Sequence, residues 1–194
     1  MPPGAGLGQT QRPTYLSMDA SDDLYVIDGG KNGRLQRRDR QGRWTVLVEP
    51  GPARDPLGLG EWTAVAAAPN GNIYVAGFVD SPGGRQYRLL MLDSKGRWTA
   101  VAAVGHELGQ VSWVTALATD SIGRLYVADQ GNSRLQVRDV NGKWYELPAP
   151  SSAEHSEPLF WRPSCAAVDG RGGVYIGAFP VGVLRWMPQP NRQR

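Results

Sequence analysis

The chain has 194 residues, of which 41% are hydrophobic and 20% are charged, and its formal net charge is +3. This length allows one domain with a well-buried core. The 25 glycines and 15 prolines lie outside low-complexity runs, which indicates a turn-rich all-β protein rather than a disordered one. The single cysteine, Cys165, excludes an internal disulfide, and its place in the apolar stretch 164–168 predicts a buried, unreactive thiol.

No apolar run in the sequence is long enough to span a membrane. Residues 1–11 also lack the charged start and the apolar centre of a signal peptide. We therefore expect a soluble protein of the cytoplasm, or an exported protein if the sequence is a trimmed piece of a longer one.

Residues 1–12 are rich in proline and glycine. They predict a loose N-terminal tail. The alternative is a closing strand, formed near Leu7–Gln11, that covers an edge elsewhere in the chain.

Four similar units follow, and each contains a tyrosine in a short β-rich motif. The motifs LYVID, IYVAG, LYVAD and VYIGA recur about every 50 residues, with the tyrosine at Tyr25, Tyr74, Tyr126 and Tyr175. A small or apolar run precedes each motif across a turn, and a strand beginning Arg-Leu follows it in the first three units. There the turn Asp-x-x-Gly-(Arg/Lys)-Trp leads into a fourth strand, at Trp44, Trp98 and Trp144.

Four antiparallel strands per unit at this spacing are typical of a propeller blade. We predict an all-β fold, a β-propeller of four blades over residues 13–188, followed by a C-terminal tail at 189–194. The predicted blades are 13–50, 62–104, 113–149 and 161–188. The last unit offers only three strands before Pro188, so we predict an incomplete blade whose edge is covered by the N-terminal segment or by another subunit.

The stretches LYVADQGNSRLQVRD, in the third unit, and LYVIDGGKNGRLQRRD, in the first, resemble NHL repeats. The shared pattern is a Tyr-Val-Ala-Asp strand, a Gly/Asn turn, and Arg-(Ile/Leu)-Gln leading to Asp-x-x-Gly. The resemblance covers residues 13–188. The second unit departs from it, because Gly77 replaces the Asp and the turn is longer, and the fourth unit lacks both the Asp and the Asn-x-Arg.

Two acid–base pairs, Asp28 with Arg34 and Asp129 with Arg134, join the end of one strand to the start of the next. A carboxylate and a guanidinium so placed can pair across the turn and fix it. The pair is incomplete in units two and four, as a local brace allows and a shared active site does not. We interpret both pairs as structural.

The blade-to-blade connections and the middle hairpin turns of a propeller share one face, and in this sequence they are long and varied. Functional residues tend to lie on variable loops held by a rigid scaffold. The candidate partner-binding residues of this loop-rich face are Trp62, His106, Glu107, Trp113, His155 and Trp161. The tryptophans have an alternative role in capping the gaps between blades. The two histidines with Glu107 and Glu154 also leave a metal site open, although no close ligand spacing supports one, and we predict no metal and no cofactor.

The sequence leaves three functions open. The resemblance implies a non-enzymatic protein-interaction module, a scaffold or small structural subunit that binds a protein partner or multi-subunit complex, or a second copy through blade four. No nucleophile motif, phosphate-binding glycine loop or catalytic triad is evident. The alternative is a metal-dependent enzyme of the lactonase or lyase kind, as some related propellers are. The third is single-stranded nucleic-acid binding, which the acidic loops and the confinement of basic residues to one blade disfavour.

Overall fold

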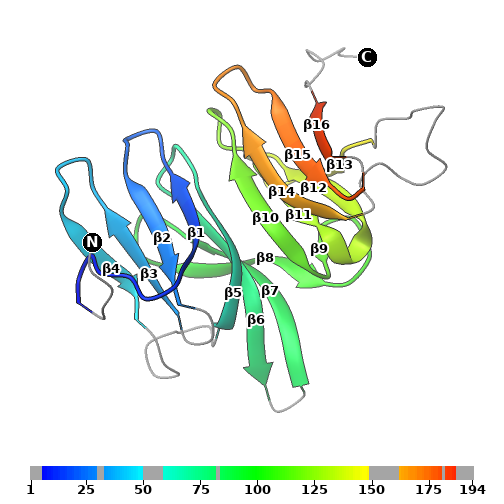
Figure 1. Ribbon diagram of the computed structural model, residues 1–194. Helices are drawn as coiled ribbons and strands as arrows, with labels where there is room; N and C mark the ends of the chain where they lie inside the picture. The colour runs from blue at the N-terminus through cyan, green and yellow to red at the C-terminus, as the bar shows by residue number, and fades with distance from the viewer. Residues whose placement is uncertain are drawn as a thin grey trace.

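The computed structural model describes residues 6–29, 33–49, 59–81, 84–148, 162–180 and 182–186. Within these ranges the protein consists of β-strands and one short 3₁₀ helix, η1 (Gln130–Asn132). Figure 1 shows four sheets that stand side by side in an arc, as the blades of a propeller. The predicted all-β propeller of four blades is confirmed.

Each blade is a meander of antiparallel strands. The strands of blade one are β1 (Pro13–Met18), β2 (Leu24–Asp28), β3 (Arg34–Arg38) and β4 (Trp44–Val48). Those of blade two are β5 (Leu59–Ala67), β6 (Ile73–Ser81), β7 (Gly84–Leu92) and β8 (Trp98–Val104), with the short β9 (Gln110–Val111) parallel to β8. Blade three has β10 (Val114–Thr119), β11 (Leu125–Asp129), β12 (Arg134–Arg138) and β13 (Trp144–Glu146).

The fourth blade has three strands in the part of the chain that the structure describes. They are β14 (Pro163–Val168), β15 (Val174–Ala178) and β16 (Gly182–Trp186), as the sequence predicts for an incomplete last blade. Residues 7–11, considered above as a closing strand, contact blade one instead, where the backbone N–H groups of Gly8 and Gln11 donate to Gln36 and Asp28.

Side chains alternate across each strand, so every blade can present an apolar surface on both faces. Three core clusters result, one between each pair of consecutive blades. Among the fully buried side chains at these contacts are Ile27, Val75, Leu89, Leu125, Leu135 and Ile176. None of the three clusters joins blade one to blade four.

The predicted Asp-x-x-Gly turns close the outer hairpins. In blade two, Oδ1 of Asp93 accepts hydrogen bonds from the backbone N–H groups of Lys95 and Arg97, both at 2.9 Å. Gly96 follows with φ +79°, a left-handed conformation that glycine adopts without strain. The carboxylate therefore satisfies the turn that carries the chain from β7 to β8.

The chain enters blade three through a segment that folds back over the blade, and we call residues 107–112 the linker clasp of blade three. Gln136 holds it by accepting the Gly109 N–H on Oε1 at 2.8 Å and donating from Nε2 to the Gln110 carbonyl at 2.8 Å. Arg134 donates from Nη2 to the carbonyls of Glu107, at 2.7 Å, and Gln110, at 3.0 Å.

Residues 6–11 form the linker clasp of blade one with the same contacts. Gln36 accepts the Gly8 N–H on Oε1 at 3.0 Å and donates from Nε2 to the Gln9 carbonyl at 3.0 Å. Arg34 donates from Nη2 to the Gly6 carbonyl at 3.0 Å and to the Gln9 carbonyl at 2.5 Å. The two clasps are thus equivalent structures in two blades.

The two Asp–Arg pairs also belong to the clasps. Nε of Arg34 lies 3.4 Å from Oδ2 of Asp28, and Nε of Arg134 lies 3.2 Å from Oδ2 of Asp129, with all four side chains nearly buried. The interpretation of these pairs as structural braces is confirmed, because each guanidinium is engaged by its own blade and by the incoming linker.

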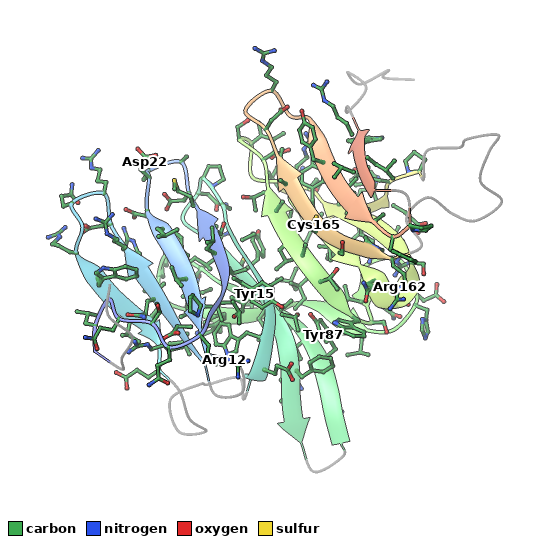
Figure 2. All side chains as sticks on the ribbon, viewed as in Figure 1. Arg12, Tyr15, Asp22, Tyr87, Arg162 and Cys165 are labelled. Atoms are coloured by element: carbon green, nitrogen blue, oxygen red, sulfur yellow. The ribbon has the colours of Figure 1, made fainter. Side chains whose placement is uncertain are left out.

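Cys165 is exposed, so the prediction of a buried thiol is wrong. Its neighbour Ala166 packs against blade three, and strand alternation directs Cys165 to the opposite face of blade four. No described blade packs there, which leaves the thiol open to solvent (Figure 2). In the described ranges, no helix is long and apolar enough to cross a membrane.

Candidate functional site

Blade two departs from its neighbours at Gly77, which pairs with Arg88 where Asp28 pairs with Arg34 in blade one. A Cβ at Gly77 would lie 2.3 Å from the Glu61 carbonyl oxygen, because strand β5 runs against β6 at this point. No side chain fits, so blade two has no carboxylate at the position that braces the arginine in blades one and three.

The hairpin of β6 and β7 is also longer, with nine residues in each strand against five in the matching strands of blade one. It projects beyond the other blades in Figure 1. The pairing of β7 with β8 begins at Leu89, opposite Ala102, while Ala103 and Val104 pair with β9. Strands β7 and β8 therefore diverge beyond Leu89 and Ala102, and we call this open end of the strand pair the fork.

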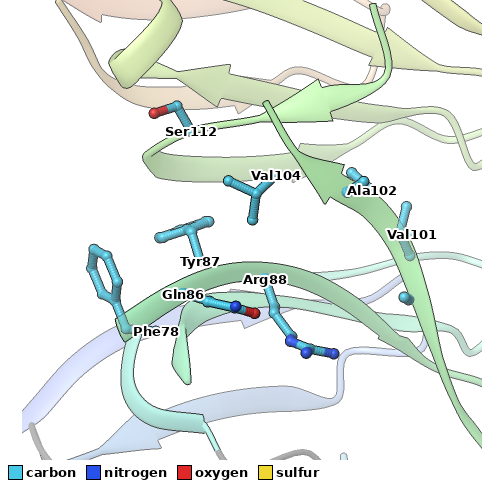
Figure 3. A pocket seen from close by; sticks show the side chains of 10 residues that line it. Phe78, Gln86, Tyr87, Arg88, Val101, Ala102, Val104 and Ser112 are labelled. Atoms are coloured by element: carbon cyan, nitrogen blue, oxygen red, sulfur yellow. The ribbon is translucent and has the colours of Figure 1, made fainter. Parts of the chain in front are cut away.

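A cleft of about 640 Å³ lies at this fork. Figure 3 shows Phe78, Gln86, Tyr87 and Arg88 along one side, Val101, Ala102 and Val104 along β8, and Ser112 above them. Most of these side chains are apolar or aromatic, and Arg88 adds a positive charge. A cleft with this lining suits an apolar group that carries a nearby negative charge.

Hydrogen bonds between blades two and three fix Tyr87, which lines the cleft. The hydroxyl of Tyr87 donates to the Val114 carbonyl at 2.7 Å, and Thr63 Oγ1 donates to the same oxygen at 2.8 Å. Phe78 meets the Tyr87 ring edge-to-face with centroids 4.8 Å apart. Burial raises the pKa of Tyr87, so this phenol stays neutral and keeps its donor at physiological pH.

Arg88 differs from the arginines at the same position of blades one and three. Arg34 and Arg134 are nearly buried and hold the linker clasps. Arg88 is exposed at the cleft and has no acidic partner among the described residues. Its side chain is exposed and lines the cleft.

The predicted partner-binding residues differ in how far the structure exposes them. Trp62 is only 4% exposed and packs in the core between blades one and two, which is the alternative role of capping a gap between blades. Trp113 is 49% exposed and directly follows Ser112, which lines the cleft. Of these two tryptophans, only Trp113 exposes its ring to solvent.

His106 and Glu107 belong to the linker before blade three. Nδ1 of exposed His106 lies 2.6 Å from Oδ1 of Asn132, and the Glu107 backbone carbonyl accepts a hydrogen bond from Arg134. His155 and Trp161 lie outside the described residues. Within the ranges that the structure describes, no group of three or more His, Cys, Asp or Glu side chains is placed to hold a metal ion.

The cleft residues themselves, Phe78, Arg88, Val101 and Val104, were not predicted from the sequence. A signal for them was present, because the replacement of the usual Asp by Gly77 and the lengthened turn both mark blade two as different. The divergence of β7 and β8, however, is a matter of register that the repeat pattern does not encode.

Comparison with known proteins shows the fold. No protein-family model and no curated protein matches the chain. Among solved structures, it is similar to a virginiamycin B lyase from Staphylococcus aureus, with 11% identity and a TM-score of 0.57 over 96% of this chain and 59% of that one. A gluconolactonase from Xanthomonas campestris has 17% identity and a TM-score of 0.55 over 90% and 61% of the two chains.

The structure of the hydrazine synthase of Kuenenia stuttgartiensis is similar at 16% identity and a TM-score of 0.60, over 90% of this chain and 58% of that one. The structural neighbours are β-propeller proteins. This chain spans about three-fifths of the length of these three structures. At these identities the likeness shows the propeller fold alone.

Proposed function

We propose that the chain is a non-enzymatic interaction module, a subunit of a larger assembly that binds a protein segment in the cleft of blade two. The segment would place an apolar side chain between β7 and β8 and a carboxylate against Arg88. The observation that carries this proposal is Arg88 itself, a guanidinium released from the structural brace of the other blades and placed beside an apolar cleft.

Three further features support a protein partner. Val104, Leu108 and Trp113 are 54%, 53% and 49% exposed, and all three lie on or beside the linker that borders the cleft. Tryptophan and arginine are the residues most enriched at the energetic centres of interfaces. The hydrogen bond that holds the lining residue Tyr87 to Val114 also lowers the entropic cost of binding, because the site is formed in advance.

A display library of random peptides on phage, selected on the immobilised chain, tests the proposal. The wild-type protein should enrich peptides that combine a bulky apolar residue with Asp or Glu. Arg88→Glu should remove the acidic preference, and Val104→Asp should abolish enrichment. Arg171→Glu, at an exposed turn of blade four, is the matched control and should select the same peptides as the wild type.

Identical peptide selection by the wild type and by Arg88→Glu would contradict the proposed role of Arg88. Enrichment that survives both cleft variants would exclude the cleft as the binding site.

The second candidate is an enzymatic function, which the similarity to a lyase and a gluconolactonase favours. It predicts a bound metal ion, so titration with calcium or zinc should raise the thermal unfolding temperature of the chain and support hydrolysis of a sugar lactone. An unchanged unfolding temperature and no hydrolysis would remove this candidate.

A further inference from the structure

The two end blades of the arc expose apolar side chains on their outer faces. Leu16 and Met18 of β1 are 72% and 59% exposed, and Val183 of β16 is 73% exposed. Cys165 of β14 is exposed on the same face of blade four as Val183. Apolar strand residues at the contacts between consecutive blades are buried or partly buried, so these two faces resemble contacts that lack their other half.

The contact between blades two and three shows what the outer face of blade one is built to do. Leu117 of β10 is 7% exposed and belongs to a cluster with Ala64, Ala66 and Tyr74 of blade two. Leu117 pairs with Val127 on the neighbouring strand, as Leu16 pairs with Val26. Leu16 thus holds the position in blade one that Leu117 holds in blade three.

The correspondence extends over the whole face. Five residues of blade three that pack on blade two each have a counterpart at the same strand position in blade one. In chain order, the blade-three residues are Val114, Leu117, Leu125, Val127 and Trp144. The counterparts, in the same order, are Pro13, Leu16, Leu24, Val26 and Trp44. The linker clasps are also the same in both blades. Blade one therefore carries the surface with which a blade packs on the blade before it.

Blade four carries the complementary surface. Leu117 packs in a cluster with five blade-two residues, which are Ala64, Ala66, Tyr74, Ala76 and Leu89. The residues at the same strand positions of blade four are, in the same order, Cys165, Ala167, Tyr175, Gly177 and Val183. In three of these five positions both blades have a small residue, and in a fourth both have a tyrosine. The small side chains leave room for a leucine, as they do beneath Leu117.

The largest departure is Arg185, which stands where blade two has Met91. Arg37 of blade one stands at the same position, opposite Tyr25, and pairs with Asp23 of its own blade. Arg185 is likewise satisfied within blade four, over the Tyr175 ring at 5.6 Å and 3.9 Å from Asp169. An arginine at this position is therefore compatible with a blade on that face.

We propose that the outer face of blade four receives the outer face of blade one of a second copy of the chain. The contact is head-to-tail, because two different surfaces meet, and it uses neither the cleft of blade two nor its ligand. A head-to-tail contact either closes into a ring or propagates into a filament. In both arrangements Leu16 and Cys165 become buried.

Light scattering behind a sizing column, with two variants and their mixture, tests this directly. Leu16→Arg removes one face and Val183→Arg removes the other, and both residues are exposed, so the fold of the single chain is kept. The wild type should have the mass of two or more chains, and each variant alone should have the 21.1 kDa of one chain. Their equimolar mixture should form a species of two chains, because one intact face remains on each.

Val140→Arg, at an exposed apolar residue of a turn, is the matched control and should assemble as the wild type does.

The outcomes distinguish the alternatives. If Val183→Arg still forms a dimer while Leu16→Arg does not, blade one pairs with itself and the proposal is wrong. A wild-type chain that is monomeric at all concentrations overturns the proposal, whether its Cys165 reacts freely with a thiol reagent or is protected by a contact within the chain. Failure of the peptide selection at the cleft would leave this result unaffected.

Discussion

Blades one and three are the same structure in two surroundings. Each is entered through a linker clasp held by an Asp, an Arg and a Gln at matching positions, with matching hydrogen bonds. Blade three has blade two behind it, and its Leu117 is buried, whereas Leu16 of blade one is 72% exposed. Each blade therefore holds its clasp with its own residues, whereas burial of its outer face depends on a neighbouring blade.

The largest expected effect comes from breaking a clasp. Asp129→Ala would remove the buried carboxylate of Arg134, leave it only the exposed Glu146 at 3.6 Å, and should lower the free energy of unfolding by about 3–5 kcal/mol. Asp28→Ala should cost a similar amount, because Arg34 makes the matching buried ion pair and the matching hydrogen bonds to the linker clasp. Urea unfolding of the two variants measures both costs. A cost for Asp28→Ala below about 1 kcal/mol would show that the two clasps are not energetically equivalent.

The outer faces should respond differently to the same substitution. Leu117→Ala should cost about 2–5 kcal/mol because it opens a cavity between blades two and three. Leu16→Ala should cost less than about 0.5 kcal/mol when measured at high dilution, because the side chain is exposed in the single chain. Equal costs at high dilution would mean that blade one is already covered from within the chain.

Two glycines test the equivalence of the clasps at finer scale. Gly8 and Gly109 have φ of +74° and +82°, and an added Cβ would lie 2.6 Å from Cδ1 of Trp44 or 2.8 Å from Cδ1 of Trp144. Alanine at either site should cost more than about 1 kcal/mol. Gly172→Ala is the control, because φ is +80° there and no atom lies within 4 Å of the added Cβ. Thermal unfolding should rank both clasp variants below this control, and the reverse order would contradict the close packing of tryptophan on glycine.

The smallest effect concerns the turn before the last strand of blade one. A hydrogen bond from the Arg43 backbone N–H lowers the pKa of Asp39 below its ordinary value of 3.8. The carboxylate therefore contributes stability above the pKa of the unfolded chain and loses it as pH falls through the lower pKa of the folded chain. The unfolding temperature of Asp39→Asn should lie below that of the wild type at pH 6 and approach it near pH 3. A difference that persists at pH 3 would assign the effect to something other than charge.

The fold could be predicted from the sequence because its signals repeat. The tyrosine motifs, the Asp-x-x-Gly turns and the Asp–Arg braces each recur, and local chemistry decides all three. The three strands that the structure describes in the last blade also match the strand signals of the fourth unit. Because these motifs repeat, secondary structure and the order of the blades can be predicted without knowing which residues pack against each blade.

The candidate site could be predicted only in part, because exposure depends on what packs against a strand. Trp62 and Trp113 occupy related places in the sequence, yet one is buried between blades and the other is half exposed. Cys165 lies in a strand that reads as core but faces away from blade three. The cleft arises from a fork between β7 and β8 and from the exclusion of any side chain at Gly77, which are properties of three-dimensional register.

Head-to-tail assembly can be measured through the reaction rate of the Cys165 thiol with a thiol reagent across a dilution series of the wild-type chain. Head-to-tail contact between copies predicts that the rate falls as protein concentration rises, because blade one of another copy covers the thiol. Leu16→Arg should react at the fast rate throughout the series. A wild-type rate that does not change with concentration would contradict the claim that a second copy completes the outer faces of the arc.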